Sequence, residues 1–300
     1  MSCGILLQPI LYNKTNTGSI VVRGYVFNNL FQSMKEMIYD FSRKRVALSV
    51  CFDESSYELR DVETSIRFCI FAFDHVESLY FDNVNWNDVQ WHVVFRWCSR
   101  LNNLKMVRFN NSNVPIDVLT CSLREMKLLH VEFMKCKIGH EHLPKLFGNL
   151  CDSLEELELT SCGVSSQDLA NGALVISEAN RRNLNTLSVT GNGLTSGFVD
   201  VWLDSCLGMK KMVVSPGLSS TIDDFLRPSV FVHPTLEKII FGVCGWNFDQ
   251  GEMGKFLGDE RRKAARGMMA YLRGRFIVSK SSIRKLFPDA DRLVWRLLRS

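Results

Sequence analysis

The residues of this chain that come closest to a metal-binding set are Cys136, His140 and His142, with Glu141 between the two histidines. Thiolate, imidazole and carboxylate groups are the usual ligands of zinc, but the spacing C-x3-H-x-H matches no common zinc pattern. We therefore predict that the chain binds no metal ion and no other cofactor. The two histidines are interpreted as exposed residues at the start of a helix.

Sequence motifs for covalent catalysis or phosphate binding are also missing. A catalytic Ser or Cys needs a neighbouring base, and the chain contains no G-x-S-x-G or Q-A-C-x-G frame. It has no P-loop and no G-x-G-x-x-G, and the segment Gly191-Asn192-Gly193 is better explained as a turn between repeated elements. The sequence predicts no catalytic residues and a protein that is not an enzyme.

Positive charge is concentrated towards the C-terminus. From Met253 onward the chain has 13 Lys and Arg against 4 Asp and Glu, whereas the rest has 23 against 28. The densest part is Arg261-Arg262-Lys263 with Arg266. Three interpretations stay open: a solvated helix face, a docking surface for a protein or an anionic surface, and a nucleic-acid contact in which Tyr271 and Phe276 stack on bases. The same cluster could act as a nuclear import patch.

The ten cysteines are scattered along the chain and include no C-x-x-C pair. Several occupy apolar positions, which favours buried thiols in a reducing compartment over a disulfide framework. No apolar run reaches the roughly 18 residues that a membrane span needs, and the N-terminal segment lacks a positive n-region and a small-residue cleavage site. We expect a cytoplasmic protein, with the nucleus as the alternative, and no membrane partner.

The elements that must position these residues follow a repeat, which is clearest in LEELELTSCGV at residues 154–164. Leu154, Leu157 and Leu159 are followed by Cys162 and Val164, in the pattern L-x-x-L-x-L-x-x-C-x-V. The apolar triad recurs with spacings of 28, 24, 26, 30, 25 and 27 residues, and its seven starting residues are Val76, Leu104, Leu128, Leu154, Leu184, Met209 and Leu236. Each frame predicts a short strand with alternate residues facing a core.

One further position in each copy is often Cys or Asn. Five residues after the middle apolar residue stand Cys136, Cys162, Asn192 and Cys244. We predict that these side chains turn inward and hydrogen-bond backbone groups left over where each strand ends. Three copies are interpreted as degenerate at this site, because they have Val84, Ser112 and Gly217 there.

Apolar residues between the strands recur at helical spacing. The first predicted helix would bury Val89, Val93, Val94, Trp97 and Leu101. In the later helices, Ser165 or Ser166 would act as a cap for one helix and Ser196 would precede another. Their expected buried residues are Leu143, Leu146, Phe147 and Leu150, then Leu169, Ala173 and Ile176, then Val199, Leu203 and Leu207.

We divide the chain into residues 1–75, 76–250 and 251–300. The first part has possible strands at residues 20–22 and 47–52 and an amphipathic helix pattern at residues 27–41. It is interpreted as an N-terminal cap or degenerate repeats, since terminal repeats are atypical; a separate small α/β domain is the alternative. The last part is expected to be a basic helical cap or tail, with helical stretches at residues 256–275 and 281–298.

The segments LEELELTSCGV and LNTLSVTGNGL resemble leucine-rich repeats of the cysteine-containing and ribonuclease-inhibitor-like types, over about residues 76–246. The resemblance implies an α/β solenoid with a parallel β-sheet on the concave side and helices on the convex side. The wider group includes F-box/leucine-rich-repeat proteins, which are substrate receptors of ubiquitin ligases. The first 50 residues here have no L-P-x-E opening followed by three helices.

In such a stack, the residues that alternate with the inward apolar residues face the concave side. The protein-binding residues that we predict at these positions are Tyr80, Arg108, Glu132, Met134, Glu156, Glu158, Lys211 and Lys238. The first hypothesis is therefore a non-catalytic module that binds a protein partner through the concave face of the solenoid. The alternatives are a substrate-recognition or adaptor subunit of a ubiquitin ligase, and a nucleic-acid-associated protein that uses the basic tail.

Overall fold

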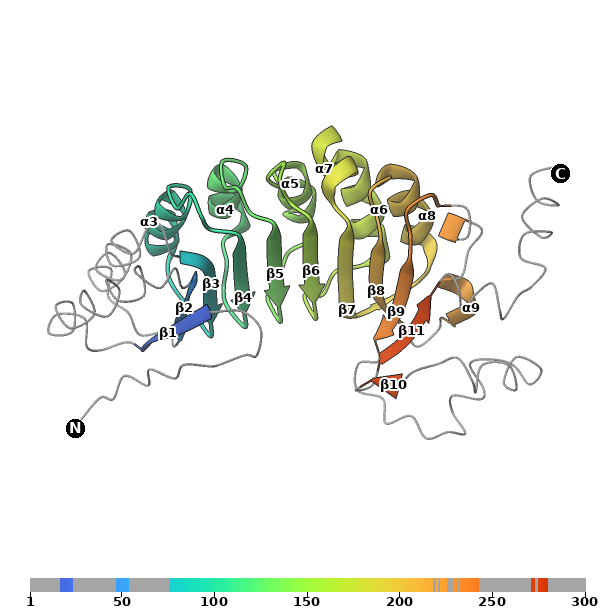
Figure 1. The fold of residues 1–300 in the computed structure, drawn as a ribbon, viewed down its shortest axis with the longest axis horizontal. Helices are drawn as coiled ribbons and strands as arrows, with labels where there is room; N and C mark the ends of the chain where they lie inside the picture. Colours follow the sequence, from blue (N-terminus) through green and yellow to red (C-terminus); the bar gives the residue numbers. More distant parts are fainter. Residues whose placement is uncertain are drawn as a thin grey trace, which may run out of the picture. The chain divides into compact units, whose positions relative to one another are not determined.

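The structure is a computed structural model, and it describes residues 17–23, 47–53, 76–217, 220, 222–225, 229–230, 233–242, 271–272 and 275–279. The chain divides into two compact units. The N-terminal unit contains residues 1–138 and 149–154, and the C-terminal unit contains residues 139–148 and 155–300. Both units are α/β, with strands and helices alternating along the chain from residue 76 (Figure 1).

The N-terminal unit contains a sheet of parallel strands. These are β1 (Thr17–Arg23), β2 (Ala47–Asp53), β3 (Val76–Asp82), β4 (Met106–Asn110) and β5 (His130–Met134). Each strand pairs in parallel with the next one along the chain. The strands expected at residues 20–22 and 47–52 are therefore present, and they belong to the same sheet as the first three repeat frames.

A ladder of four phenylalanines forms the centre of this unit's core. The register pairs Phe52 with Phe81, Phe81 with Phe109, and Phe109 with Phe133. The rings are stacked, with centroids 5.1, 5.3 and 5.0 Å apart, and each residue is at most 1% exposed. The same inward frame position recurs in every strand, so like side chains meet across the ladder and stabilise the pairing.

Helices α3 (Asp88–Cys98) and α4 (Ile116–Leu123) pack beside one another in the N-terminal unit. Helix α3 begins at a capping box: the Asn87 side chain accepts a hydrogen bond from the Gln90 N–H, and the Gln90 side chain accepts one from the Asn87 N–H. This box satisfies two backbone donors that a helix start leaves free.

The buried face predicted for this first helix is wrong in part. Of the expected residues, Val94 and Leu101 are buried, whereas Val93 and Trp97 are half-buried and Val89 is 60% exposed. The apolar residues that α3 buries are Trp91, Val94, Phe95 and Cys98. Both stripes have helical spacing, and the one with the larger aromatic area is the one that packs in the core, because burial free energy scales with apolar area.

The C-terminal unit has its own parallel strands, β6 (Glu156–Thr160), β7 (Thr186–Leu194), β8 (Lys211–Pro216) and β9 (Lys238–Gly242). Its helices are α5 (Leu143–Gly148), α6 (Ser166–Val175), α7 (Glu178–Asn183), α8 (Gly197–Ser205) and α9 (Ile222–Phe225). All seven predicted repeat frames thus contain a strand. Helix α7 was not predicted, because its sequence EANRRN has no apolar stripe.

The helices of the C-terminal unit pack through the expected apolar residues, with one exception. Leu207 is 59% exposed, since α8 ends at Ser205 before the expected stripe is complete. In the core, the buried indole N–H of Trp202 donates to the Leu169 carbonyl at 2.7 Å, and its ring lies against Phe147 with centroids 5.6 Å apart. Gly172 of α6 faces the same Phe147 ring so closely that a Cβ there would overlap it.

The chain after β9 differs from the prediction. Strand β11 (Arg275–Ser279) pairs antiparallel with β9, and β10 (Tyr271–Leu272) pairs antiparallel with β11. The helix predicted for residues 256–275 is therefore wrong at residues 271–272 and 275. The β-branched pair Ile277-Val278 favours a strand. The helix patterns at residues 27–41 and 281–298, Cys244 and the basic cluster at residues 261–266 lie outside the described residues.

A left-handed turn follows four of the strands, β3 to β6, and the equivalent turn occurs within β7. The residues there are Asn83 (φ 57°), Asn111 (φ 47°), Lys135 (φ 53°), Ser161 (φ 55°) and Gly191 (φ 75°). At three of these turns the backbone N–H donates to a carbonyl of the following strand at 2.8 Å: Asn83 to Asn110, Asn111 to Met134, and Ser161 to Thr190. The turn therefore links each of these strands to the next copy, at the cost of a backbone conformation that L-residues disfavour.

The next residue after this turn satisfies backbone groups at the strand ends. Cys136 donates to the carbonyls of Phe109 and Met134, both at 3.4 Å. Asn192 makes the fullest set of such bonds, to three carbonyls and two N–H groups. Ser112 was predicted to be degenerate, and this prediction is wrong: its hydroxyl donates towards Phe81 and Asn110 and accepts from the Val84 N–H at 3.0 Å.

Candidate protein-interaction surface

In each unit, the side chains that alternate with the core residues form the outward face of the sheet. The N-terminal face consists of Ser78, Tyr80, Asp82, Met106, Arg108, Asn110, His130, Glu132 and Met134. The C-terminal face consists of Glu156, Glu158, Thr160, Thr186, Ser188, Thr190, Lys211, Val213, Ser215, Lys238 and Ile240. The register places residues of the same frame position in rows across neighbouring strands.

The N-terminal face brings four of the predicted binding residues together. One row of the register is Tyr80, Arg108 and Glu132, on β3, β4 and β5. The Arg108 guanidinium lies 3.6 Å from the Glu132 carboxylate through Nε and 3.6 Å from the Met134 sulfur through Nη2. The Tyr80 hydroxyl lies 3.8 Å from the sulfur of Met106, on the neighbouring strand. Tyr, Arg and Met are enriched in protein interfaces, and Tyr and Arg among their energetic hot spots.

Within this row, Arg108 and Glu132 differ in accessibility. The Arg108 side chain is 31% exposed, whereas the Glu132 side chain is only 8% exposed. Glu132 was predicted as a contact residue. Its burial leaves little of it for a partner to touch, and it instead holds the guanidinium of Arg108 in place.

Two acceptor oxygens at the ends of β3 and β4 have no hydrogen-bond partner among the described residues. They are Asp82 Oδ1 and Asn110 Oδ1, which neighbour one another in the register. The other Asp82 oxygen accepts from the Cys51 thiol at 3.5 Å. Cys51 pairs with Tyr80 in the register and belongs to the same row. The sequence did not lead us to predict Cys51 as a residue of this face. The repeat copies were counted only from Val76 onward, although a strand at residues 47–52 was expected.

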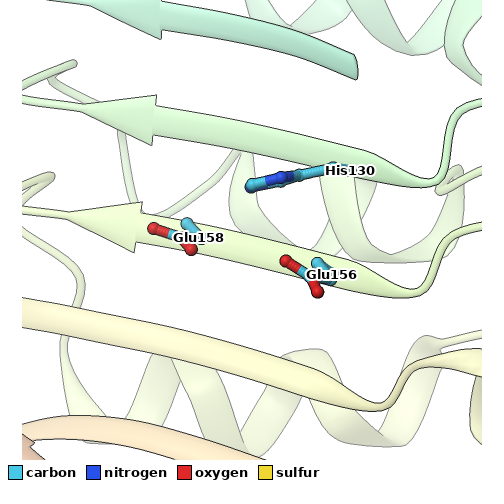
Figure 2. A group of neighbouring side chains, drawn as sticks. All are labelled: His130, Glu156 and Glu158. Carbon is cyan, nitrogen blue, oxygen red and sulfur yellow. The ribbon is translucent and has the colours of Figure 1, made fainter. Parts of the chain in front are cut away.

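The C-terminal face has opposite charges on different strands. Glu156 and Glu158 lie along β6 (Figure 2). The register continues from Glu156 to Thr186 on β7, then to Lys211 on β8 and Lys238 on β9. Glu156 and the two predicted basic residues are thus in one row, separated by a threonine, whereas Glu158 pairs with Ser188 in the next outward row.

Several outward positions of the C-terminal unit are buried, although exposure was expected. Thr186, Ser188 and Val213 are 4%, 5% and 4% exposed, and Ile240 is 8% exposed. Thr160 and Thr190 share a hydrogen bond of 3.1 Å between their hydroxyls. These side chains are shorter than Glu or Lys, so they lie at the floor of the face, with the longer charged side chains beside them.

The two lysines of the row face one another in the register. Lys211 is half-buried and Lys238 is exposed. Within the described part of the chain, neither ammonium group makes an ion pair. Like charges directly opposite on neighbouring strands are destabilising, so the charges of these two lysines do not stabilise the pairing of β8 with β9.

Cys136 and His140, which resemble part of a metal site in the sequence, hydrogen-bond to other groups of the protein. The Cys136 thiol donates to two backbone carbonyls, and its burial raises the pKa of that thiol, which disfavours the thiolate that a metal requires. His140 instead lies 2.6 Å from the Asp168 carboxylate, through Nδ1. Burial likewise raises the pKa of the Cys206 thiol to about 12.

Asp168 also brings a serine and a histidine together, Ser165 and His140. Its Oδ2 accepts from the Ser165 hydroxyl at 2.5 Å and from the Ser165 N–H at 2.9 Å, and it is the atom that His140 approaches. A nucleophilic serine needs the imidazole as its own hydrogen-bond partner. Here both groups bind the carboxylate, and Ser165 with Asp168 forms the capping box that begins α6.

None of the helices in the described residues combines the length and apolarity needed to cross a bilayer. Comparison of the chain with models of known protein families and with curated proteins found no match.

Proposed function

We propose that this chain is a non-catalytic protein-interaction module, built as a leucine-rich-repeat solenoid, that binds a protein partner through the outward face of its parallel strands. The observation that carries the proposal is the repeated register. At matching positions of successive strands, core residues alternate with side chains suited to a protein interface. Solenoid proteins commonly bind through an extended face of this kind.

The N-terminal face supports the proposal most strongly. Two pairs of side chains are in contact there, Tyr80 with Met106 and Arg108 with Met134, so these side chains are already ordered before a partner arrives. Ordered side chains lose less conformational entropy on binding. The unsatisfied oxygens of Asp82 and Asn110 lie on the same face, and buried polar groups without a partner need an explanation. Hydrogen-bond donors supplied by a bound protein would provide one.

Site-specific photo-crosslinking tests this proposal. A benzophenone amino acid replaces Tyr80 on the N-terminal face in one variant and Val89 on α3, which is 60% exposed, in the matched control. We expect the Tyr80 variant to crosslink a defined protein in cells and the Val89 variant not to do so. Equal crosslinking from both positions, or crosslinks from Val89 alone, would contradict binding through the strand face.

A further inference from the structure

We propose that the C-terminal face binds a protein segment carrying both charges: an acidic side chain over Lys211 and Lys238, and a basic side chain over Glu156 and Glu158. This inference rests on the proposed function and names the chemistry of the partner in one unit. It follows from the charge and burial of one register row, Glu156, Thr186, Lys211 and Lys238.

The two lysines are the first part of the argument. They oppose one another on neighbouring strands, and no carboxylate among the described residues neutralises them. Protein surfaces usually avoid this arrangement, because like charges in register repel. A carboxylate placed between the two ammonium groups would turn the repulsion into two attractive contacts, which is the arrangement that an acidic partner residue supplies.

The floor of the face is the second part of the argument. Thr186 and Ser188 of β7 separate the acidic strand β6 from the basic strand β8, and both are at most 5% exposed. Their short side chains leave the longer glutamates and lysines standing on either side. A bound segment that lies across β7 would therefore contact both charged groups of the row.

Strand spacing sets the distance between the two charges of the partner. Neighbouring strands are about 4.8 Å apart, so β6 is separated from β8 by roughly 10 Å and from β9 by roughly 14 Å. An extended chain advances about 3.4 Å per residue. The partner's basic and acidic residues should therefore be separated by about four positions in an extended segment, since side chains four positions apart point to the same side.

Selection from a displayed library of random linear peptides, with the full-length chain as bait, tests the inference. We expect enriched peptides to contain a basic and an acidic residue about four positions apart. Their affinity should fall at least 10-fold in the variant Lys211→Glu/Lys238→Glu and less than 2-fold in the matched control Lys127→Glu/Lys210→Glu. Circular dichroism of both variants checks that they are folded.

The outcomes distinguish the two proposals. Enriched peptides that carry no charge pair, or that bind the Lys211→Glu/Lys238→Glu variant equally well, overturn the charge inference and leave the proposed function, which the Tyr80 crosslinking tests, intact. Crosslinks from Val89 alone in that test overturn both. Selection on Glu156→Lys/Glu158→Lys, which should replace the basic peptide residue with an acidic one, provides a second measurement.

Discussion

Asn192 offers the most direct test of how the repeats hold their strand ends. Its side-chain carbonyl accepts from the N–H groups of Cys162 at 2.9 Å and Val164 at 3.3 Å. Its amide donates to the carbonyls of Leu159 at 2.6 Å, Val189 at 3.1 Å and Thr190 at 3.3 Å. Asn192→Ala would remove all of these bonds and leave two backbone donors without a partner.

The expected loss of stability follows from the donors. An orphaned N–H costs about 1–3 kcal/mol. Both bonds are partly buried, so water reaches these groups to some degree and the lower half of the range applies. Two orphaned N–H groups at about 1.5 kcal/mol each lead us to expect that Asn192→Ala lowers the free energy of unfolding by about 3 kcal/mol. Asn192→Cys, which imitates Cys136 and Cys162, keeps a donor for the carbonyls and should lose less.

Urea unfolding followed by circular dichroism measures the change in stability, and hydrogen exchange of the Cys162 and Val164 amides measures it locally. A local loss of 3 kcal/mol corresponds to exchange faster by about 10²-fold. The matched control is Asn171→Ala, which removes one exposed side-chain bond to Gln167 and should change stability by less than about 0.5 kcal/mol. If Asn192→Ala were as mild as this control, the role assigned to the repeat asparagine would be wrong.

Three further substitutions test other features. Gly172→Ala should lower stability by about 1–3 kcal/mol in urea unfolding, because the added methyl overlaps the Phe147 ring; a gain of about 1 kcal/mol, as for an ordinary helix glycine, would disprove that contact. Ser161→Val should cost about 1–2 kcal/mol because a β-branched residue resists the left-handed turn, while Ser161→Gly should not destabilise, and thermal melts that rank the two equally would contradict the turn. Partial burial raises the pKa of the Asp168 carboxyl, but hydrogen bonds from Ser165 and His140 outweigh it and leave the pKa below its usual value. Ionised Asp168 therefore stabilises the fold above about pH 4, and this contribution disappears as the pH falls through the lowered pKa; Asp168→Asn should flatten the acid limb of a stability-pH curve, and an unchanged limb would refute it.

The strands were predictable because their signal is local. Side chains alternate along a strand, so the apolar residues at 76, 79 and 81, and at the equivalent positions of later copies, indicate both the strand and its buried face. The result is seen in the Phe52–Phe81–Phe109–Phe133 ladder, where one frame position fills one line of the core. The alternation of strands and helices follows from the length left between the frames.

Other features depend on contacts that the local sequence does not contain. Two apolar stripes compete on α3, and the choice between them depends on what Trp91 and Phe95 meet in the core. Ser112 replaces Asn or Cys because its hydroxyl reaches the same carbonyls, which a pattern restricted to those two residue types overlooks. The burial of Glu132 and Thr186 depends on the size of their neighbours across the sheet.

The position after each left-handed turn also has a consequence for synthesis on the ribosome. Ser112 completes the end of β3 through the Phe81 carbonyl, Cys136 reaches back to Phe109, and Asn192 reaches back to Leu159, 27–33 residues earlier in the chain. The end of each such strand therefore remains unsatisfied until the following copy has left the exit tunnel. At about 5–20 residues per second, each copy waits seconds for the next. During translation, the newest copy is thus the one whose backbone is open to chaperones and proteases.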